Sequence, residues 1–206
     1  MAPCNELKTQ PDIEALPGCR TLRWYDNPLQ PGKRFRSRKQ LRDWDGTNVY
    51  RLPEDQNIGV DVDEVEVTIR TCTRDDMDVN FSEGASVLKC KADDPLVNIV
   101  HLQFNPPVKA VGASVTGNWK DGREYMVALT LVLKDGSKCT PFATAPTGKF
   151  SSQRGTAPFV GAEATDGNNP IAEMYCDIYL ADQLIDDQAD VLISDLYFVP
   201  NNTSNP

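Results

Sequence analysis

Several segments of this chain alternate apolar and polar residues at every second position. The clearest is 125–133, where Val127, Leu129, Leu131 and Leu133 share one face. This period of two is typical of a β-strand with one buried side. Such segments are short and are separated by turns rich in Gly, Asp, Asn and Pro, and few segments repeat at helical spacing. The pattern predicts an all-β sandwich, because two such sheets can bury their apolar faces against each other.

The strand and turn patterns predict three parts of the chain: an N-terminal arm, a single domain and a C-terminal tail. Residues 1–19 are predicted to form an N-terminal arm tied by a disulfide, with a helical turn near 11–16. Residues 20–200 are predicted to form a single β-sandwich domain, and 201–206 a flexible tail. Strands are expected at 20–26, 65–69, 85–90, 98–104, 108–116, 125–133, 138–143, 159–164, 171–180 and 191–199, with turns at Asp121-Gly122 and Asp135-Gly136.

Six cysteines are scattered along the chain and form no Cys-x-x-Cys pair. Their even number in a β-rich chain favours disulfides and an oxidising compartment, with buried thiols as the alternative. Six cysteines allow fifteen connectivities. We expect the pairs that are adjacent in sequence: Cys4–Cys19, Cys72–Cys90 and Cys139–Cys176.

These cysteines lead us to expect a secreted or cell-surface protein. Met1-Ala2-Pro3-Cys4 has neither the basic nor the apolar region of a signal peptide, so this expectation assumes that a signal peptide was removed. A cytosolic location is the alternative. No run of residues approaches the length of a membrane span, about 20 apolar residues.

The charge is unevenly distributed. The net charge of −9 argues against a nucleic-acid partner and is compatible with bound cations. Basic residues nevertheless gather between 20 and 42, and Arg34, Arg36, Arg38 and Arg42 form a candidate site for an acidic or sulfated partner. The alternative is a solvated loop or an edge strand protected by charge.

The order of segments in 98–199 resembles a known family. These segments are Leu102-Gln103-Phe104, the run Pro106-Pro107-Val108-Lys109-Ala110-Val111-Gly112-Ala113, Phe159-Val160-Gly161 and Ile193-Ser194-Asp195-Leu196-Tyr197-Phe198. They resemble jelly-roll domains of secreted and surface bacterial proteins, including PEP-CTERM-anchored ones, which are similar to carbohydrate-binding modules of the galactose-binding-like fold. The resemblance implies a jelly-roll β-sandwich of two antiparallel sheets and a non-catalytic role in binding carbohydrate or in surface adhesion.

The resemblance also implies a structural calcium ion that joins the first strand to the last. The matching positions are Asp26 and Asp195, and backbone carbonyls would have to complete the ligand shell. This chain departs from the family pattern at Ser194, where a second acidic residue is usual, and it has no C-terminal Pro-Glu-Pro anchor. The alternative role of Asp195 is to cap a turn or to pair with an arginine.

Sugar-binding modules need exposed aromatic rings beside polar groups. Trp44, Tyr50 and Trp119 lie in polar segments, and Asn118 and Asp121 flank Trp119 as candidate partners for sugar hydroxyls. The alternative is that these rings cover the ends of the core.

The sequence contains no clear set of catalytic residues. His101 is the only histidine, which excludes zinc sites built on two histidines, and on a strand a lone histidine is usually structural. The segment from Asp61 to Glu66 resembles the Glu-x-Asp-x-x-Glu pattern of jelly-roll glucanases, which makes Asp63 and Glu66 alternative catalytic carboxylates. A charged loop before a strand is the better interpretation of the segment from Asp61 to Glu66. A polysaccharide hydrolase or lyase and a structural subunit that binds another protein remain as alternative functions.

Overall fold

The computed structural model describes residues 2–24, 34–35, 49–51, 57–61, 66–71, 80–81, 86–91, 100–117, 122, 124–146, 157–180 and 190–201. For residues 34–35, 49–51, 57–61, 66–71, 86, 89–91, 180 and 190, only the backbone is described. Within these residues, no helix is long and apolar enough to cross a membrane.

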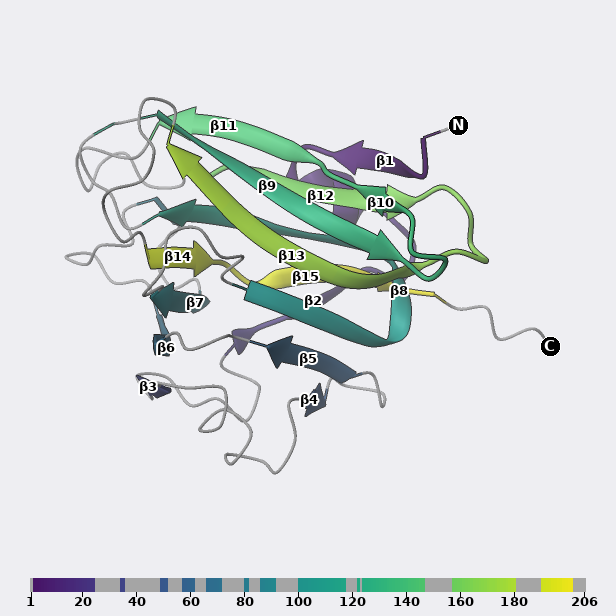
Figure 1. Ribbon diagram of the computed structural model, residues 1–206, viewed down its shortest axis with the longest axis horizontal. Helices are drawn as coiled ribbons and strands as arrows, with labels where there is room; N and C mark the ends of the chain where they lie inside the picture. The colour runs from purple at the N-terminus through teal and green to yellow at the C-terminus, as the bar shows by residue number, and fades with distance from the viewer. Residues whose placement is uncertain are drawn as a thin grey trace.

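The described residues form fifteen strands and one short helix (Figure 1). The strands are β1 Cys4–Leu7, β2 Arg20–Leu22, β3 Arg34–Phe35, β4 Val49–Arg51, β5 Asn57–Asp61, β6 Glu66–Thr71, β7 Ser86–Lys91, β8 Val100–Gly117, β9 Glu124–Leu133, β10 Lys138–Cys139, β11 Phe142–Pro146, β12 Phe159–Ala164, β13 Ile171–Leu180, β14 Asp190–Ile193 and β15 Leu196–Pro200; the helix is α1 Gln10–Glu14. Neighbouring strands pair antiparallel, as in β13 with β9 and β12 with β8. The predicted all-β fold is therefore confirmed.

The long strand β8 changes its neighbours midway. Its first half lies between β5 and β13. Its second half lies between β12 and the consecutive strands β14 and β15. Pro106 and Pro107, which have no N–H to donate to a ladder, lie where one set of partners gives way to the other. Figure 1 shows that β8 bends along its length. The sequence predicted a break at these prolines, whereas the strand continues through them.

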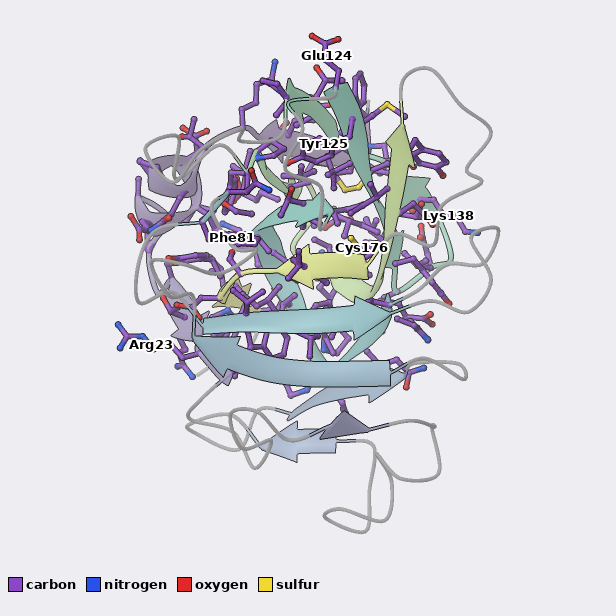
Figure 2. The ribbon with its side chains drawn as sticks, turned by 90° about the vertical axis from the view of Figure 1, so that its left-hand side faces the viewer. Arg23, Phe81, Glu124, Tyr125, Lys138 and Cys176 are labelled. Carbon is purple, nitrogen blue, oxygen red and sulfur yellow. A yellow bond between two sulfur atoms is a disulfide. The ribbon has the colours of Figure 1, made fainter. Side chains whose placement is uncertain are left out.

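The strands bury their apolar faces as the alternation predicts. Val127, Leu129 and Leu131 of β9 are fully buried, and Met174 and Cys176 of β13 pack in the same core. Figure 2 shows Cys176 inside the molecule, while Glu124 and Arg23 point outward from its periphery. The predicted turn at Asp135-Gly136 joins β9 to β10, and Gly136 has a φ of 84°, which glycine adopts readily.

Trp24 fixes one end of the core to the last strands. Its side chain is 1% exposed, and its indole Nε1 donates a hydrogen bond of 2.8 Å to the carbonyl oxygen of Ser194. A buried tryptophan needs such a partner for its N–H. The contact joins the described N-terminal segment to the junction between β14 and β15.

The N-terminal residues pair with the sheet. β1 runs antiparallel to β12, with Cys4 opposite Ala164. The helical turn predicted in this region is confirmed as α1, which buries Ile13. The carboxylate of Asp12 accepts hydrogen bonds from the backbone N–H groups of Lys8 and Thr9, as acidic side chains in a first helical turn commonly do.

The expected disulfide pattern is wrong at two of its three pairs. Cys4 is bonded to Cys139, which excludes Cys4–Cys19 and Cys139–Cys176. Cys139 and Cys176 lie on strands on opposite sides of β9. Two strand spacings separate them by about 9.5 Å, whereas bridged Cα atoms lie within about 7 Å of each other.

The pair Cys72–Cys90 remains a prediction. Cys72 lies outside the described residues, and only the backbone of Cys90 is described. Cys19 and Cys176 carry thiols. The Cys4–Cys139 bond fits the prediction of an oxidising compartment.

Candidate functional site

One side of the sheet collects polar and aromatic side chains. We call it the outer face: the solvent-facing side of β11, β9, β13 and the first half of β8. On β13, Met174, Cys176 and Ile178 are buried in the core, so the residues between them point the other way. The outer face comprises His101, Gln103, Met126, Ala128, Thr130, Val132, Phe142, Thr144, Glu173, Tyr175, Asp177 and Tyr179.

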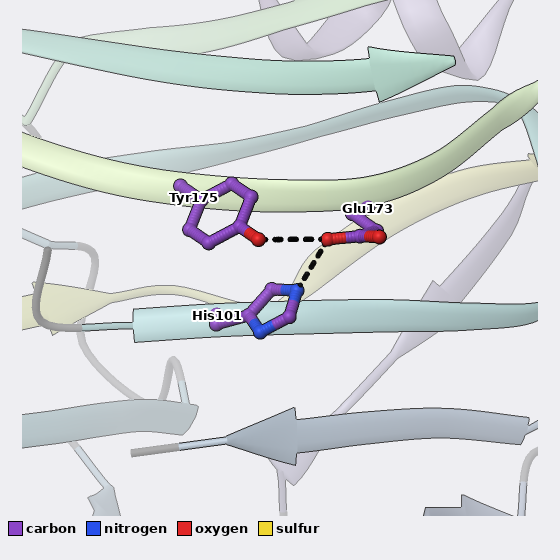
Figure 3. A network of polar contacts seen from close by, with 3 residues as sticks. All are labelled: His101, Glu173 and Tyr175. Carbon is purple, nitrogen blue, oxygen red and sulfur yellow. Dashed lines mark hydrogen bonds and ion pairs between the residues drawn. The ribbon is translucent and has the colours of Figure 1, made fainter. Parts of the chain in front are cut away.

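Three of these side chains form a polar cluster, shown in Figure 3. His101 Nε2 lies 2.8 Å from Glu173 Oε2, and the Tyr175 hydroxyl donates a hydrogen bond of 2.8 Å to the same oxygen. The side chains of His101 and Glu173 are 18% and 33% exposed. The cluster is therefore accessible from solvent on its carboxylate side.

Strand register assembles this cluster. Tyr175 of β13 lies directly opposite His101 of β8, and Glu173 lies opposite Gln103. Directly opposed side chains are about 5 Å apart at Cβ, which lets the two rings stack. Among the described residues, Glu173 Oε1 accepts no hydrogen bond. One carboxylate oxygen is thus fixed by the protein, and the other is available to a ligand.

Asp177 is the second carboxylate of the outer face. It lies between Tyr175 and Tyr179 along β13 and opposite Ala128 of β9. Burial raises the pKa of Asp177, because a partly desolvated carboxylate disfavours its charge. Within the described part of the chain, its carboxylate has neither a hydrogen bond nor an ion pair.

The outer face also carries the exposed aromatic rings. Phe142 is 60% exposed and Tyr179 is 45% exposed, and they are the two exposed large apolar side chains among those described. Phe142 lies opposite Ala128, whose other neighbour is Asp177. Burial raises the pKa of Tyr179, and the charge of Asp177 raises it further. The two rings and Asp177 therefore belong to one patch.

Most of the site residues predicted from the sequence cannot be placed. Asp26, Trp44, Asp63, Asn118, Trp119, Asp121, Arg36, Arg38 and Arg42 lie outside the described residues, and only the backbone is described for Arg34, Tyr50 and Glu66. Arg34 belongs to β3, Tyr50 to β4 and Glu66 to β6. Their roles remain predictions.

Asp195 is the predicted metal ligand that the structure describes. It follows Ser194 in the short link between β14 and β15. The Ser194 hydroxyl accepts a hydrogen bond from the Ser114 N–H and donates one to the Asp195 carbonyl oxygen. The described residues contain no group of three or more His, Cys, Asp or Glu side chains able to hold a metal ion. The calcium site remains a prediction.

The sequence did not reveal the cluster around Glu173. The sequence favours a structural role for His101, and it predicts a strand over 171–180 without assigning a role to Glu173, Tyr175, Asp177 or Tyr179. The signal that could have pointed to them is the composition of that side, since two acids and two tyrosines alternate along one strand.

Comparison with known proteins supports the fold. The chain matches no protein-family model and no curated protein sequence. Among solved structures, it is similar to a DUF4465 family protein from Bacteroides caccae. That similarity has a TM-score of 0.53 and 11% identity, and it covers 88% of this chain and 99% of that one.

Two further solved structures match this chain at lower TM-scores. An exo-β-agarase matches with a TM-score of 0.42 and 11% identity over 75% of this chain and 24% of that chain. The enzymatically active domain of a bacteriophage CBA120 tailspike protein matches with a TM-score of 0.33 and 10% identity over 72% of this chain and 20% of that chain. At 11% identity, the similarity to the DUF4465 family protein describes the fold alone.

Proposed function

We propose that this protein is a secreted carbohydrate-binding domain without catalytic activity, and that its outer face binds the glycan. The observation that carries the proposal is the position of the two exposed aromatic rings. Phe142 and Tyr179 lie on the same face as Glu173 and Asp177. An exposed ring beside a carboxylate suits a ligand that is apolar on one side and rich in hydroxyl groups at its edge.

A pyranose ring is such a ligand. Its C–H groups pack against the flat face of an aromatic side chain, which gains apolar contact area with few rotatable bonds to order. Its hydroxyls donate to carboxylate oxygens in charge-assisted hydrogen bonds. Tyr179 and Phe142 supply the rings, and Asp177 supplies the carboxylate beside them. Glu173 Oε1 and the Gln103 amide would contact another unit of the same oligosaccharide, because Glu173 is six residues from Tyr179 along β13, or about 20 Å.

The Glu173 carboxylate is held in place before any ligand arrives. His101 and Tyr175 both contact its other oxygen. A group whose rotamer is already fixed loses less entropy on binding, and this raises affinity. The cluster thus acts as an oriented acceptor for sugar hydroxyls.

The spacing of the acids favours binding over hydrolysis. Glu173 and Asp177 are four residues apart on β13, which places their Cα atoms about 13 Å apart. Side chains on one face of a strand stand roughly perpendicular to the sheet, so the two carboxyl groups are separated by a similar distance. The paired carboxyl groups of glycosidases lie about 5–9.5 Å apart. The hydrolase or lyase alternative therefore depends on Asp63 and Glu66, whose side chains are not described.

Two observations support the finer features of the proposal. The change of partners along β8 is what a strand shared by the two sheets of a jelly-roll sandwich would show. The Cys4–Cys139 bond favours an oxidising, secretory environment. A structural calcium at Asp26 and Asp195, and an acidic or sulfated partner at Arg34–Arg42, remain part of the proposal.

A glycan array probed in the presence of calcium tests this function. We expect binding to at least one glycan class above background, and Tyr179→Ala to weaken it about tenfold through loss of ring contact. Tyr179→Phe is the matched control because it keeps the ring and should retain most of the affinity. The absence of binding to every glycan, or equal binding by Tyr179→Ala, would overturn the proposal.

A further inference from the structure

We infer that the glycan bound by the outer face carries protonated amino groups, and that Asp177, between Tyr179 and Phe142, holds one of them. The ligand class is an amino sugar with a free amine, such as a polymer of glucosamine units. This inference rests on the proposed function and names the chemistry that its site selects.

The first argument concerns the missing partner of Asp177. Its carboxylate is partly buried, yet no described group donates a hydrogen bond or a positive charge to it. Placing a carboxylate in a partly desolvated position costs free energy unless a cation or donor compensates. A ligand ammonium group provides both a charge and N–H donors. Proteins retain such costly groups where binding recovers the cost.

The second argument is the position of the aromatic rings beside this carboxylate. Tyr179 is two residues along the same face of β13, and Phe142 lies across β9 with only Ala128 between it and Asp177. Ala128 is small, so its side chain leaves room above it. An ammonium ion that approaches Asp177 therefore lies between two aromatic residues, whose Cα atoms are about 7 Å away along β13 and about 9.5 Å away across the sheet, and such rings attract cations.

The third argument is the charge of the outer face. Its acidic side chains are Glu173 and Asp177, and Glu124 lies at the nearby end of β9. The basic side chain described on this side is Lys138, which lies opposite Val132. Lys138 is four residues from Phe142, or about 13 Å along the edge. Among the described side chains, the end of the face around Asp177 is therefore acidic, and this charge favours an amino sugar over a uronic acid or a sulfated sugar.

The exposed rings distinguish a sugar from a protein ligand with the same charge. A lysine side chain shares the ammonium group but has no flat ring with which to cover Tyr179 and Phe142. We therefore take the amino sugar as the occupant, and a lysine-rich peptide enters the experiment as a competitor.

Isothermal titration with two oligosaccharides of equal length tests the inference. One is built of glucosamine and the other of N-acetylglucosamine, so that they differ in amine charge, and both are measured at mildly acidic pH. We expect the wild type to bind the glucosamine oligomer about tenfold more tightly, as one charge-assisted contact would give. Asp177→Asn should lose this preference and keep its affinity for the acetylated oligomer.

The controls separate this inference from the proposed function and from bulk charge. Glu6→Gln removes the same charge from an exposed position of β1 and should keep the preference. Tyr179→Ala should weaken the binding of both oligomers, because both contact the ring, and the glucosamine oligomer more strongly, because the ring also attracts its ammonium group.

Three outcomes would overturn the inference. Equal affinity of the wild type for the two oligomers would do so while leaving the carbohydrate-binding proposal intact. An equal loss of preference in Glu6→Gln would show that net charge alone is responsible. Tighter binding of a lysine-rich peptide than of the glucosamine oligomer would assign the site to a protein partner.

Discussion

The rings of His101 and Tyr175 are stacked, with centroids 4.2 Å apart and planes inclined by 5°. They come from β8 and β13, where they are directly opposed. Both present a polar atom to Glu173 Oε2. The stack thus orients His101 Nε2 and the Tyr175 hydroxyl toward the same carboxylate. Loss of the stack should therefore also change the position of Glu173.

Tyr175→Phe distinguishes the contribution of the ring stack to stability from that of the hydrogen bond. The variant keeps the ring but removes the hydroxyl that contacts Glu173. We expect a loss of about 0.5–1.5 kcal/mol in the free energy of unfolding, measured by urea denaturation. Tyr175→Leu should lose about 0.5–1.5 kcal/mol more, because the ring contact disappears as well. Equal stability of the two variants would contradict a contribution from stacking.

Removal of the Cys4–Cys139 bond should destabilise the fold substantially. The two cysteines are 135 residues apart in sequence, and a bond that closes so long a loop restricts the unfolded chain strongly. We expect the Cys4→Ser/Cys139→Ser double variant to lose about 2–5 kcal/mol of unfolding free energy. Guanidinium denaturation of both proteins without reductant measures the difference.

Peptide mapping provides the accompanying control. A non-reduced digest should contain the peptide of Cys4 joined to that of Cys139. Cys19→Ser should leave both that product and the stability essentially unchanged, because Cys19 is a thiol. Recovery of a Cys4–Cys19 peptide would contradict the pairing seen in the structure.

Local patterns were enough to predict much of the fold. β12 and β13 have the predicted bounds, 159–164 and 171–180, and β9 begins one residue before the predicted 125–133. β9 and β13 each have one buried face, so the period of two is visible in their sequence, whereas β12 is buried on both faces. The last predicted strand, 191–199, is divided into β14 and β15 at Ser194 and Asp195. The alternation of apolar residues does not predict this break.

The pairing of distant segments could not be predicted in the same way. Cys4 is bonded to Cys139 in a structure where β1 pairs with β12, and no alternation or turn pattern in residues 1–19 predicts these neighbours. His101 and Glu173 are 72 residues apart, and they meet through the register of β8 and β13. That register includes a shift between Ile171 and Glu173, so even a correct pairing of strands would not have placed these residues.

Gly161→Ala should destabilise the protein through a backbone clash. Gly161 lies opposite Gly112, and a Cβ at Gly161 would meet the Val111 carbonyl oxygen at 2.7 Å and Gly112 Cα at 2.9 Å. Backbone atoms in a paired strand cannot move aside easily, so we expect a loss of about 1–3 kcal/mol by urea denaturation. Gly167→Ala is the matched control, because a Cβ there has no atom within 4 Å. A similar effect of the two substitutions would contradict this argument.

Asp177 should make stability fall as the pH rises. Burial raises its pKa above the ordinary value for an aspartate, so between the unfolded and folded pKa values the folded state binds more protons than the unfolded state. By linkage, the free energy of unfolding then decreases with rising pH. Asp177→Asn has no charge to desolvate, so we expect it to match the wild type near pH 4 and to exceed it in stability near pH 7.

Asp135→Asn is a contrasting control, because hydrogen bonds from Ser137 lower the pKa of Asp135. Asp135 therefore contributes stability above its unfolded pKa, which is lost as the pH falls, and Asp135→Asn should be less stable than the wild type at neutral pH. Urea denaturation of the three proteins at both pH values checks the signs, and a stability deficit of Asp177→Asn near pH 7 would show that a cation inside the protein already compensates this carboxylate.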